Sequence, residues 1–368
     1  MSRVVLERAT VEDDAALRRL LAESPMDGSI RVAFEREPSY FGAARVQGRF
    51  CQVILGRDAD TGEPVAVGSR TIKPVFVNGQ PRDVGYLSDL RVRAAYRGRS
   101  VLARGYRLLR ELHGDGRADL YYTVIAADNA LALGTIASGR AGLPAYRDLG
   151  SFRSPAINLG RRKPPLEAGV DLVAGTPALL DGIVYCLNEH GRAKQFAPVY
   201  ARDDFECPGR FPGFRVEDFV AARRGGRVVG TIGRWDQRDF KQTRVVGYRG
   251  PLRLLRPIVN LGAPVLGWPR FPRPGEPLRS CYAGFLAVEG NDVGVFRALL
   301  RHVYNGAVGG PHAYLLLGLH EADPLRAALD DYRCSPYRGR LFCVHFEDGA
   351  AAYRALDGRI PHVELATL

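Results

Sequence analysis

The chain has 368 residues, 46% of them hydrophobic and 25% charged, which is the composition of an ordinary globular protein and is long enough for two domains. No apolar run reaches the roughly 18 residues that a transmembrane helix needs. The opening MSRVVLERATVEDD carries acidic residues where a signal peptide needs an apolar core. These features predict a cytoplasmic protein without a transmembrane segment.

The formal net charge is +12, and almost all of the 52 basic residues are arginine. Such a bias is typical of a GC-rich coding genome, and we expect a bacterial protein. The positive balance favours an anionic ligand by long-range attraction, and a polyphosphate cofactor satisfies that as well as DNA would. Because the basic residues are spread along the chain and no nucleic-acid-binding motif is evident, we expect no nucleic-acid partner.

Six cysteines stand at positions 51, 186, 207, 281, 334 and 343, with no C-x-x-C pair among them. This spacing is not that of a disulfide framework or of a zinc site. We therefore expect reduced, mostly buried cysteines and no structural metal.

The first 160 residues predict the order strand, helix, helix, a three-stranded meander, helix, strand, helix, strand. The expected positions are 3–8, 15–21, 38–46, 50–56, 64–75, a strand ending at 92, 100–113, a strand within 118–128, a helix from about 129, and a strand within 144–159. Asn78-Gly79 is a strong hairpin signal between the second and third strands of the meander.

A charged segment rich in Gly and Pro, Gly160 to Gly169, is the best linker candidate. It predicts two domains, residues 1–160 and 170–368, joined by 161–169. The order then repeats, with elements expected at 170–173, 177–188, 216–223, 227–235, 278–288, 293–304, 313–319, 323–332 and 340–346. LYYTVIAADNALALGTIASGR and AYLLLGLHEADPLRAALDDYR match in strand, turn and helix order, which indicates a duplicated fold.

Three segments of the first 160 residues carry a resemblance to a known family. They are the opening VVLERATVEDDAALRRLL, the central LSDLRVRAAYRGRSVLARGYRLL, and TVIAADNALALGTIASG followed by AYRDLGSF. In this order they resemble the first strand and helix, the pyrophosphate loop and the fifth strand of the GNAT superfamily of acyl-CoA-dependent N-acyltransferases. The resemblance implies an α/β protein of layered α+β type, with two GNAT-like domains, each a mixed, mainly antiparallel sheet flanked by helices.

The resemblance implies a pyrophosphate loop at the start of the helix that follows the central strand. Its residues would be Arg97, Gly98, Arg99, Ser100, Val101 and Leu102. Exposed N–H groups at a helix N-terminus can bind the phosphates of acetyl-CoA or another acyl-CoA. Ser100 and Leu102 stand where the family has small residues. Ser100 can cap the helix and adds a hydroxyl donor, whereas the Leu102 side chain must point away from the phosphates. The other reading is a basic turn that merely starts a surface helix.

The same resemblance suggests further site residues. Leu90 and Val92 would offer backbone groups to the pantetheine arm, as a neighbouring strand would. Asn129 would face the cofactor near its thioester, or else cap a helix. Asp89 is the candidate general base, or else an exposed strand acid, and Tyr146 is the candidate acid for the thiolate, or else a packed aromatic.

The second half lacks the phosphate turn. Its corresponding junction, LAVEGNDVGVF, carries Glu289 and Asp292, whose carboxylates would repel a pyrophosphate. We expect this domain to bind no CoA and to serve structure or acceptor recognition.

Residues 249–277 form an apolar, arginine-bearing and proline-rich insertion between two expected strands. It could be a membrane-surface hairpin, a wall of the acceptor cleft, or a contact in a homo-oligomer. RWDQRDFKQ, residues 234–242, could stack a substrate or form a solvated turn.

The sequence thus predicts an N-acyltransferase, with acetyl as the expected acyl group. It would transfer the acyl group from acyl-CoA to a primary amine on a small molecule or peptide by direct attack. The alternative is a non-catalytic acyl-CoA-binding or sensor protein of the same fold. The sequence names neither the amine nor the length of the acyl chain.

Overall fold

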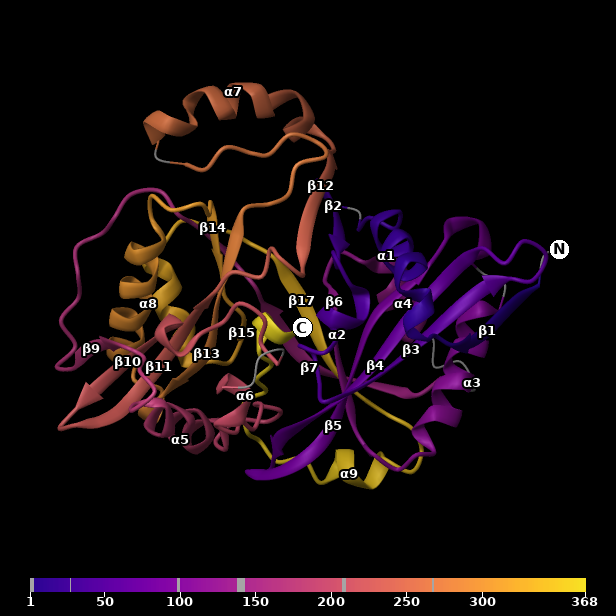
Figure 1. Ribbon diagram of the computed structural model, residues 1–368, viewed down its shortest axis with the longest axis horizontal. Helices are drawn as coiled ribbons and strands as arrows, with labels where there is room; N and C mark the ends of the chain where they lie inside the picture. Colours follow the sequence, from indigo (N-terminus) through magenta and orange to yellow (C-terminus); the bar gives the residue numbers. More distant parts are fainter. Residues whose placement is uncertain (1–2, 27, 98–99, 138–142, 207–209, 267) are drawn as a thin grey trace.

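The computed structural model describes residues 3–26, 28–97, 100–137, 143–206, 210–266 and 268–368. Two large sheets lie side by side, each flanked by helices (Figure 1).

The first sheet contains eight strands. Their spatial order is β1 (Val4–Arg8), β3 (Phe50–Asp58), β4 (Pro64–Val77), β5 (Gln80–Val92), β6 (Tyr121–Ala126), β17 (Arg338–His345), β7 (Ala145–Arg153) and β15 (Leu319–His320). The helices α1 (Asp14–Ala22) and α3 (Val101–His113) cover opposite faces of this sheet. On β4, Val67 packs with the α1 cluster, whereas Ile72, five residues later and on the other face, packs with the α3 cluster.

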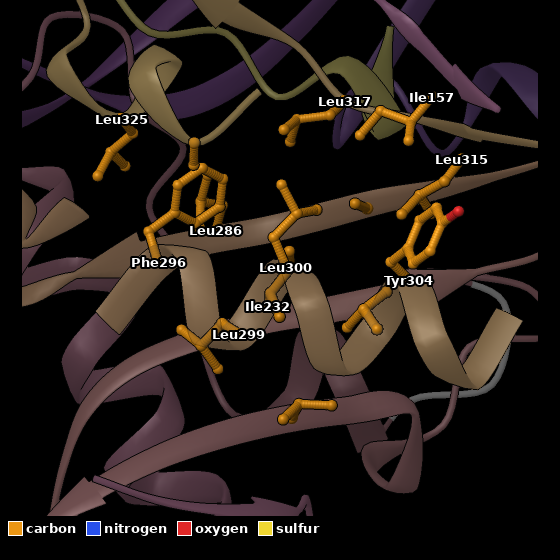
Figure 2. Close-up of a cluster of buried hydrophobic side chains, with 14 of the residues drawn as sticks. Ile157, Ile232, Leu286, Phe296, Leu299, Leu300, Tyr304, Leu315, Leu317 and Leu325 are labelled. Carbon is orange, nitrogen blue, oxygen red and sulfur yellow. The ribbon is translucent and has the colours of Figure 1, made fainter. Parts of the chain in front are cut away.

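The second sheet contains seven strands. Their order is β16 (Cys334–Ser335), β8 (Ala156–Asn158), β14 (Tyr314–Leu316), β13 (Ser280–Val288), β11 (Arg227–Trp235), β10 (Phe219–Arg224) and β9 (Asp171–Ala174). The helix α5 (Leu180–Gly191) packs on β11 and β13, and α8 (Val293–Ala307) covers β10 and β11. Figure 2 shows Phe296, Leu299 and Leu300 of α8 gathered with apolar side chains of this sheet.

The two sheets exchange their last strands. Strand β8 leaves the first half of the chain and pairs antiparallel with β14 and β16 of the second sheet. In return, β17 pairs antiparallel with β6 and β7 of the first sheet. Ile157 of β8 consequently lies beside Leu315 in the core of the second half (Figure 2). Both sheets therefore use strands from both sides of the 161–169 segment, and the domain boundaries expected there stay a prediction.

A matching irregularity in both sheets marks the duplication. In the first sheet, Asp89 and Leu90 of β5 together oppose Gly68, and Asp89 has a φ of 56°. In the second, Phe285 and its successor on β13 oppose Ile232, and Phe285 has a φ of 52°. Each is a β-bulge, and each lies on a strand that also has a parallel partner: β5 pairs parallel with β6, and β13 pairs parallel with β14. The predicted fold class and its duplication are confirmed.

The remaining helices and strands are short or were not predicted. They are α2 (Tyr40–Ala44), α4 (Ala130–Ala137), α6 (Asp203–Glu206), α7 (Pro251–Leu266), α9 (Ala350–Arg354), β2 (Ile30–Glu35) and β12 (Gln242–Tyr248), with 3-10 turns at Val11–Asp13, Ala94–Tyr96, Val216–Asp218, Glu289–Asn291, Pro324–Asp331 and Leu365–Thr367. The strands β2 and β12 pair antiparallel and so connect the two halves. The segment expected as a helix at 323–332 is a helix of the 3-10 type, Pro324–Asp331.

The reading of RWDQRDFKQ as a stacking surface was wrong, because Trp235 is only 1% exposed and Phe240 only 7%, and both belong to an aromatic core cluster. A turn does follow Trp235: the N–H groups of Phe240 and Lys241 donate to the carbonyl of Gln237, and Asp239 is exposed. Trp235 Nε1 donates to the carbonyl of Pro212, which satisfies its one polar group inside that core.

Three sequence expectations concern membrane crossing, metal and cysteine. None of the described helices has both the length and the apolar character needed to cross a membrane. Over the same residues, no group of three or more His, Cys, Asp or Glu side chains could hold a metal ion. Cys186, Cys281 and Cys343 are buried free thiols, Cys51 and Cys334 are half-buried, and Cys207 lies outside the described residues.

Candidate functional site

Strands β5 and β6 begin as parallel neighbours and then part. They pair only at Gly85 with Tyr121 and at Tyr86 with Tyr122. A Cβ atom on Gly85 would lie 2.0 Å from the Tyr121 ring, so only glycine permits this close approach where the strands meet. One residue further on, the Leu87 carbonyl accepts from the Thr123 hydroxyl at 2.8 Å instead of from a strand N–H. Beyond it, β6 continues in partnership with β17.

The part of β5 beyond this point has a backbone edge that β6 does not cover. Arg93 N donates to Val65 O of β4 at 2.8 Å, so residues 91 and 93 face β4 in the alternating antiparallel ladder, and Leu90 and Val92 face the uncovered edge. The carbonyl of Leu90 accepts from the Arg91 side chain at 2.9 Å, and that of Val92 from Arg97 Nε at 3.1 Å. These two carbonyls are the backbone groups that the sequence analysis assigned to a pantetheine arm.

The uncovered edge leads into the N-terminus of α3. Ser100 stands at the helix N-cap with φ 55° and ψ 5°, and its side chain makes no capping bond, contrary to the expectation that it caps the helix. The first N–H groups of an α-helix have no partner within the helix and can bind an anion. Gly98 and Arg99, which were assigned to the same turn, lie outside the described residues.

The next two residues of the predicted loop point into the protein. Val101 is 4% exposed and packs with Val4 and Val65. Leu102 is half-buried and packs against the cluster of Tyr106 and its neighbours beneath α3. The Leu102 side chain is therefore taken up by the core, which is the orientation that the sequence analysis required of it.

Asp89 lies at the bulge, just before the uncovered edge. Its Oδ2 accepts from the Tyr40 hydroxyl at 2.9 Å and pairs with the Arg36 guanidinium at 2.6 Å. The Asp89 side chain is only 14% exposed, which rules out the reading as an exposed strand acid. Arg36 also stacks over the Tyr40 ring, at 4.7 Å from its centroid, and its second terminal nitrogen is buried without a hydrogen-bond partner.

Lys241, from the second half, lies near this pair. Its ammonium donates to the Leu368 carbonyl at 2.5 Å and stands over the Tyr282 ring at 5.1 Å. Burial lowers the pKa of Lys241 to about 7, with the Arg36 charge adding to this effect and Asp89 opposing it. Sequence reasoning missed Arg36, Tyr40 and Lys241, because they are distant in sequence and belong to no local motif.

The candidate acid, Tyr146, is the second residue of β7 and pairs with Val344 of β17. Its hydroxyl hydrogen-bonds to that of Tyr106 on α3, and their rings meet edge to face. Burial raises the pKa of Tyr146 well above its usual value. Tyr146 is therefore a packed aromatic, as one of the two interpretations held. Its role as the acid for the thiolate stays a prediction.

Asn129 precedes α4. Its side-chain oxygen accepts from Ala132 N at 3.1 Å, so Asn129 caps this helix, as one of its two readings held. Its side chain is exposed, and its contact with a cofactor stays a prediction.

The equivalent region of the second half has different chemistry. Phe285 replaces Asp89 at the bulge, is fully buried and packs against Phe214 and Trp235. At the start of α8, the Asp292 carboxylate accepts from the N–H groups of Gly294 and Val295, which occupies donors that a phosphate would need. The second half therefore lacks a carboxylate at its bulge, and the N-terminus of its helix already binds one.

The paired sheets and the parted strands define the class of fold, which is that of the GNAT acyltransferases, here in tandem. Among similar solved structures, a GCN5-related glucosamine N-acetyltransferase region of a fungal multi-domain enzyme matches 93% of this chain, with a TM-score of 0.62 and 12% identity. The match spans 38% of that fungal enzyme. Saccharomyces cerevisiae N-myristoyltransferase with bound myristoyl-CoA matches with a TM-score of 0.61 and 11% identity, covering 94% of this chain and 83% of the yeast enzyme.

A GCN5-related N-acetyltransferase from Sphaerobacter thermophilus corresponds over nearly the full length of both proteins. The match covers 100% of this chain and 99% of the other, with a TM-score of 0.53 and 14% identity. No family model and no curated protein matches the sequence.

Proposed function

We propose that this protein is an N-acyltransferase that transfers the acyl group of an acyl-CoA to a primary amine. The observation that carries the proposal is the parting of β5 and β6, with the uncovered edge of β5 preceding the N-terminus of α3 in the chain. This arrangement offers backbone partners to an extended arm and N–H donors to a pyrophosphate in one continuous path. The similarity to an N-myristoyltransferase with bound myristoyl-CoA and to a GCN5-related N-acetyltransferase supports the same assignment.

In this proposal the backbone of Leu90 and Val92 binds the pantetheine arm. Their carbonyls now accept hydrogen bonds from the Arg91 and Arg97 side chains, and on binding they would accept from the amide N–H groups of the cofactor instead. Arg97 would then be free to turn to the phosphates, and its displacement costs little because the bond that it leaves is exposed. The net charge of +12 favours the approach of the anionic co-substrate.

We assign Asp89 as the general base. The bonds from Tyr40 and Arg36 both fall on Oδ2, so Oδ1 is the oxygen that would take a proton from the incoming ammonium, through a water molecule. The amine nitrogen then attacks the thioester carbon, the C–S bond breaks, and the thiolate takes a proton from Tyr146. Burial raises the pKa of Tyr146, so its hydroxyl is protonated at neutral pH, although the same shift makes it a weaker acid than an exposed tyrosine.

The proposed acyl group is acetyl, by similarity to two proteins described as N-acetyltransferases, and the acceptor is a small-molecule or peptide amine. Because the yeast enzyme of similar fold binds the long-chain myristoyl-CoA, the length of the acyl group has to be measured. A panel of acetyl-, hexanoyl- and myristoyl-CoA, compared by kcat/KM with one amine, measures it directly. The second half would then have a structural or acceptor-binding role.

The test of the proposal is binding followed by turnover. Isothermal titration with acetyl-CoA should show one site per chain, and a ligand of the native state alone must raise the melting temperature. Release of free CoA thiol that depends on an added amine shows transfer. Binding without such release would support the non-catalytic acyl-CoA-binding protein, and an absence of binding to every acyl-CoA of the panel would refute both.

A further inference from the structure

The helix α7 stands apart from both sheets, at the end of the β12 arm (Figure 1). Its outer side carries large apolar residues at spacings of four, three and four: Leu254 is 78% exposed, Ile258 68%, Leu261 82% and Val265 79%. This spacing places all four on one face of an α-helix. The tryptophan that follows the helix, Trp268, is 39% exposed.

The inner side of α7 already has its partner. Asn260 exchanges two hydrogen bonds with the backbone of Phe271, at 2.7 and 2.9 Å. Arg256 donates to the carbonyl of Pro272, and Ala263 is fully buried. The returning segment 268–273 thus covers the inner side of the helix. It therefore cannot also be the partner that covers the apolar outer face.

The charge around this face is mainly positive. From residue 240 to 275 the chain carries Lys241 and six arginines and no acidic residue, and the carboxylate of the next residue, Glu276, accepts from the N–H of Arg273. Arg253 on the helix, and Arg270 and Arg273 on the returning segment, are exposed. An apolar face bordered by arginines is complementary to a surface that combines an apolar interior with negative groups, and an anionic lipid leaflet is such a surface.

We propose that the outer face of α7 docks the protein onto anionic lipid membranes, with the helix lying in the plane of the surface. The apolar row enters the boundary between headgroups and acyl chains, and the arginines bind lipid phosphates. A second copy of the chain fits this face less well, because pairing two such faces brings together arginines that outnumber the neighbouring carboxylate of Glu276. The docking is independent of the proposed acyl transfer.

The chain carries its own reporter for the test. It has two tryptophans, and Trp235 is 1% exposed in the core, so a change of fluorescence on adding vesicles reports on Trp268. The full-length chain is mixed with vesicles of phosphatidylcholine alone or with an equal share of phosphatidylglycerol. We expect co-sedimentation and a blue shift with the anionic vesicles, both weakened by salt.

Matched variants separate the apolar and ionic parts. The triple variant Leu254→Ser, Ile258→Ser, Leu261→Ser should bind anionic vesicles at least about tenfold more weakly, because the removed side chains supply the apolar insertion. The control Val11→Ser removes a side chain that is 75% exposed on another part of the surface and should bind as the wild type does. The pair Arg253→Gln, Arg273→Gln should lose salt sensitivity as well as affinity.

Four results would overturn the proposal: no binding to anionic vesicles, equal binding to neutral ones, wild-type binding by the triple variant, or an α7-dependent dimer in light scattering. The last result would assign the face to a second copy, provided that the triple variant is monomeric. Because the three side chains are highly exposed, the variants should melt as the wild type does, and the melting curve checks that they fold.

Discussion

Replacing Asp89 by Asn tests the assignment of the general base. The amide keeps the size of the side chain but removes the charge that Arg36 pairs with at 2.6 Å. Since the Arg36 side chain is only 8% exposed, the change leaves a buried cation without its counter-charge. Removing one partner of a buried pair costs about 3 to 5 kcal/mol, and we expect the lower end because Tyr40 and its ring still contact Arg36. Loss of a general base lowers kcat by about 10² to 10⁴.

A second variant separates stability from catalysis. In Arg36→Met with Asp89→Asn the uncompensated cation is gone, and replacing a buried pair by residues of similar size is often close to neutral for stability. We expect the double variant to recover to within about 1 kcal/mol of the wild type in chemical denaturation. If Asp89 is the base, its activity stays as low as that of Asp89→Asn.

The assay is amine-dependent release of CoA thiol, with kcat and KM measured separately and stability measured on the same preparations. Arg36→Met alone serves as a control for the positioning of Asp89. Recovery of activity together with stability in the double variant would show that Asp89 acts only through the fold. Full activity of a stable Asp89→Asn protein would refute both the catalytic and the structural reasoning.

Three further predictions concern the cofactor site, the acid and a buried lysine. Arg97→Glu should weaken acetyl-CoA binding about tenfold in calorimetry, whereas Arg162→Glu, an exposed change in the linker segment, should not, and equal effects would show only a loss of net charge. Tyr146→Phe should lower kcat about ten- to a hundredfold with the KM for acetyl-CoA little changed, and an unaltered kcat would leave Tyr146 as a packing residue. Burial, with Arg210 adding, lowers the pKa of Lys73 to about 7 from 10.5. Between these values the unfolded chain binds a proton that the folded chain lacks, so stability rises with pH, and Lys73→Met should remove on the order of 3 kcal/mol of that rise between about pH 7 and pH 9.5. An equally steep rise in the variant's denaturation curves would assign the pH dependence to other groups.

The sequence by itself predicted the local elements and the fold class. Apolar periodicity, the Asn78-Gly79 hairpin and the strand that ends near Val92 are properties of neighbouring residues, and the structure has each of them. The path from Leu90 to Leu102 could be read in the same way, because a phosphate site built on a strand and the following helix N-terminus is contiguous in the chain. The elements of the second half follow the same order as those of the first, and this repeated order predicted the duplicated fold.

Long-range pairing decided the rest. Asp89 was an acid of unknown surroundings until β2 and α2 brought Arg36 and Tyr40 to it, about fifty residues away in sequence. The strand exchange of β8 and β17 has no local sign, since a strand's alternation is the same whichever sheet it joins. The helix at Pro251–Leu266 was hidden because its prolines and outward apolar row do not fit a helix packed on a core.

What the sequence determined, then, were the parts whose energies come from residues close in the chain: strands, helices, turns and one helix N-terminus. What only the tertiary structure decided were the burial of Asp89, its partner Arg36, and the filling of the equivalent position by Phe285. The physical reason is that desolvation and ion pairing depend on which distant segments exclude water from a side chain. That exclusion is fixed only when both sheets are assembled.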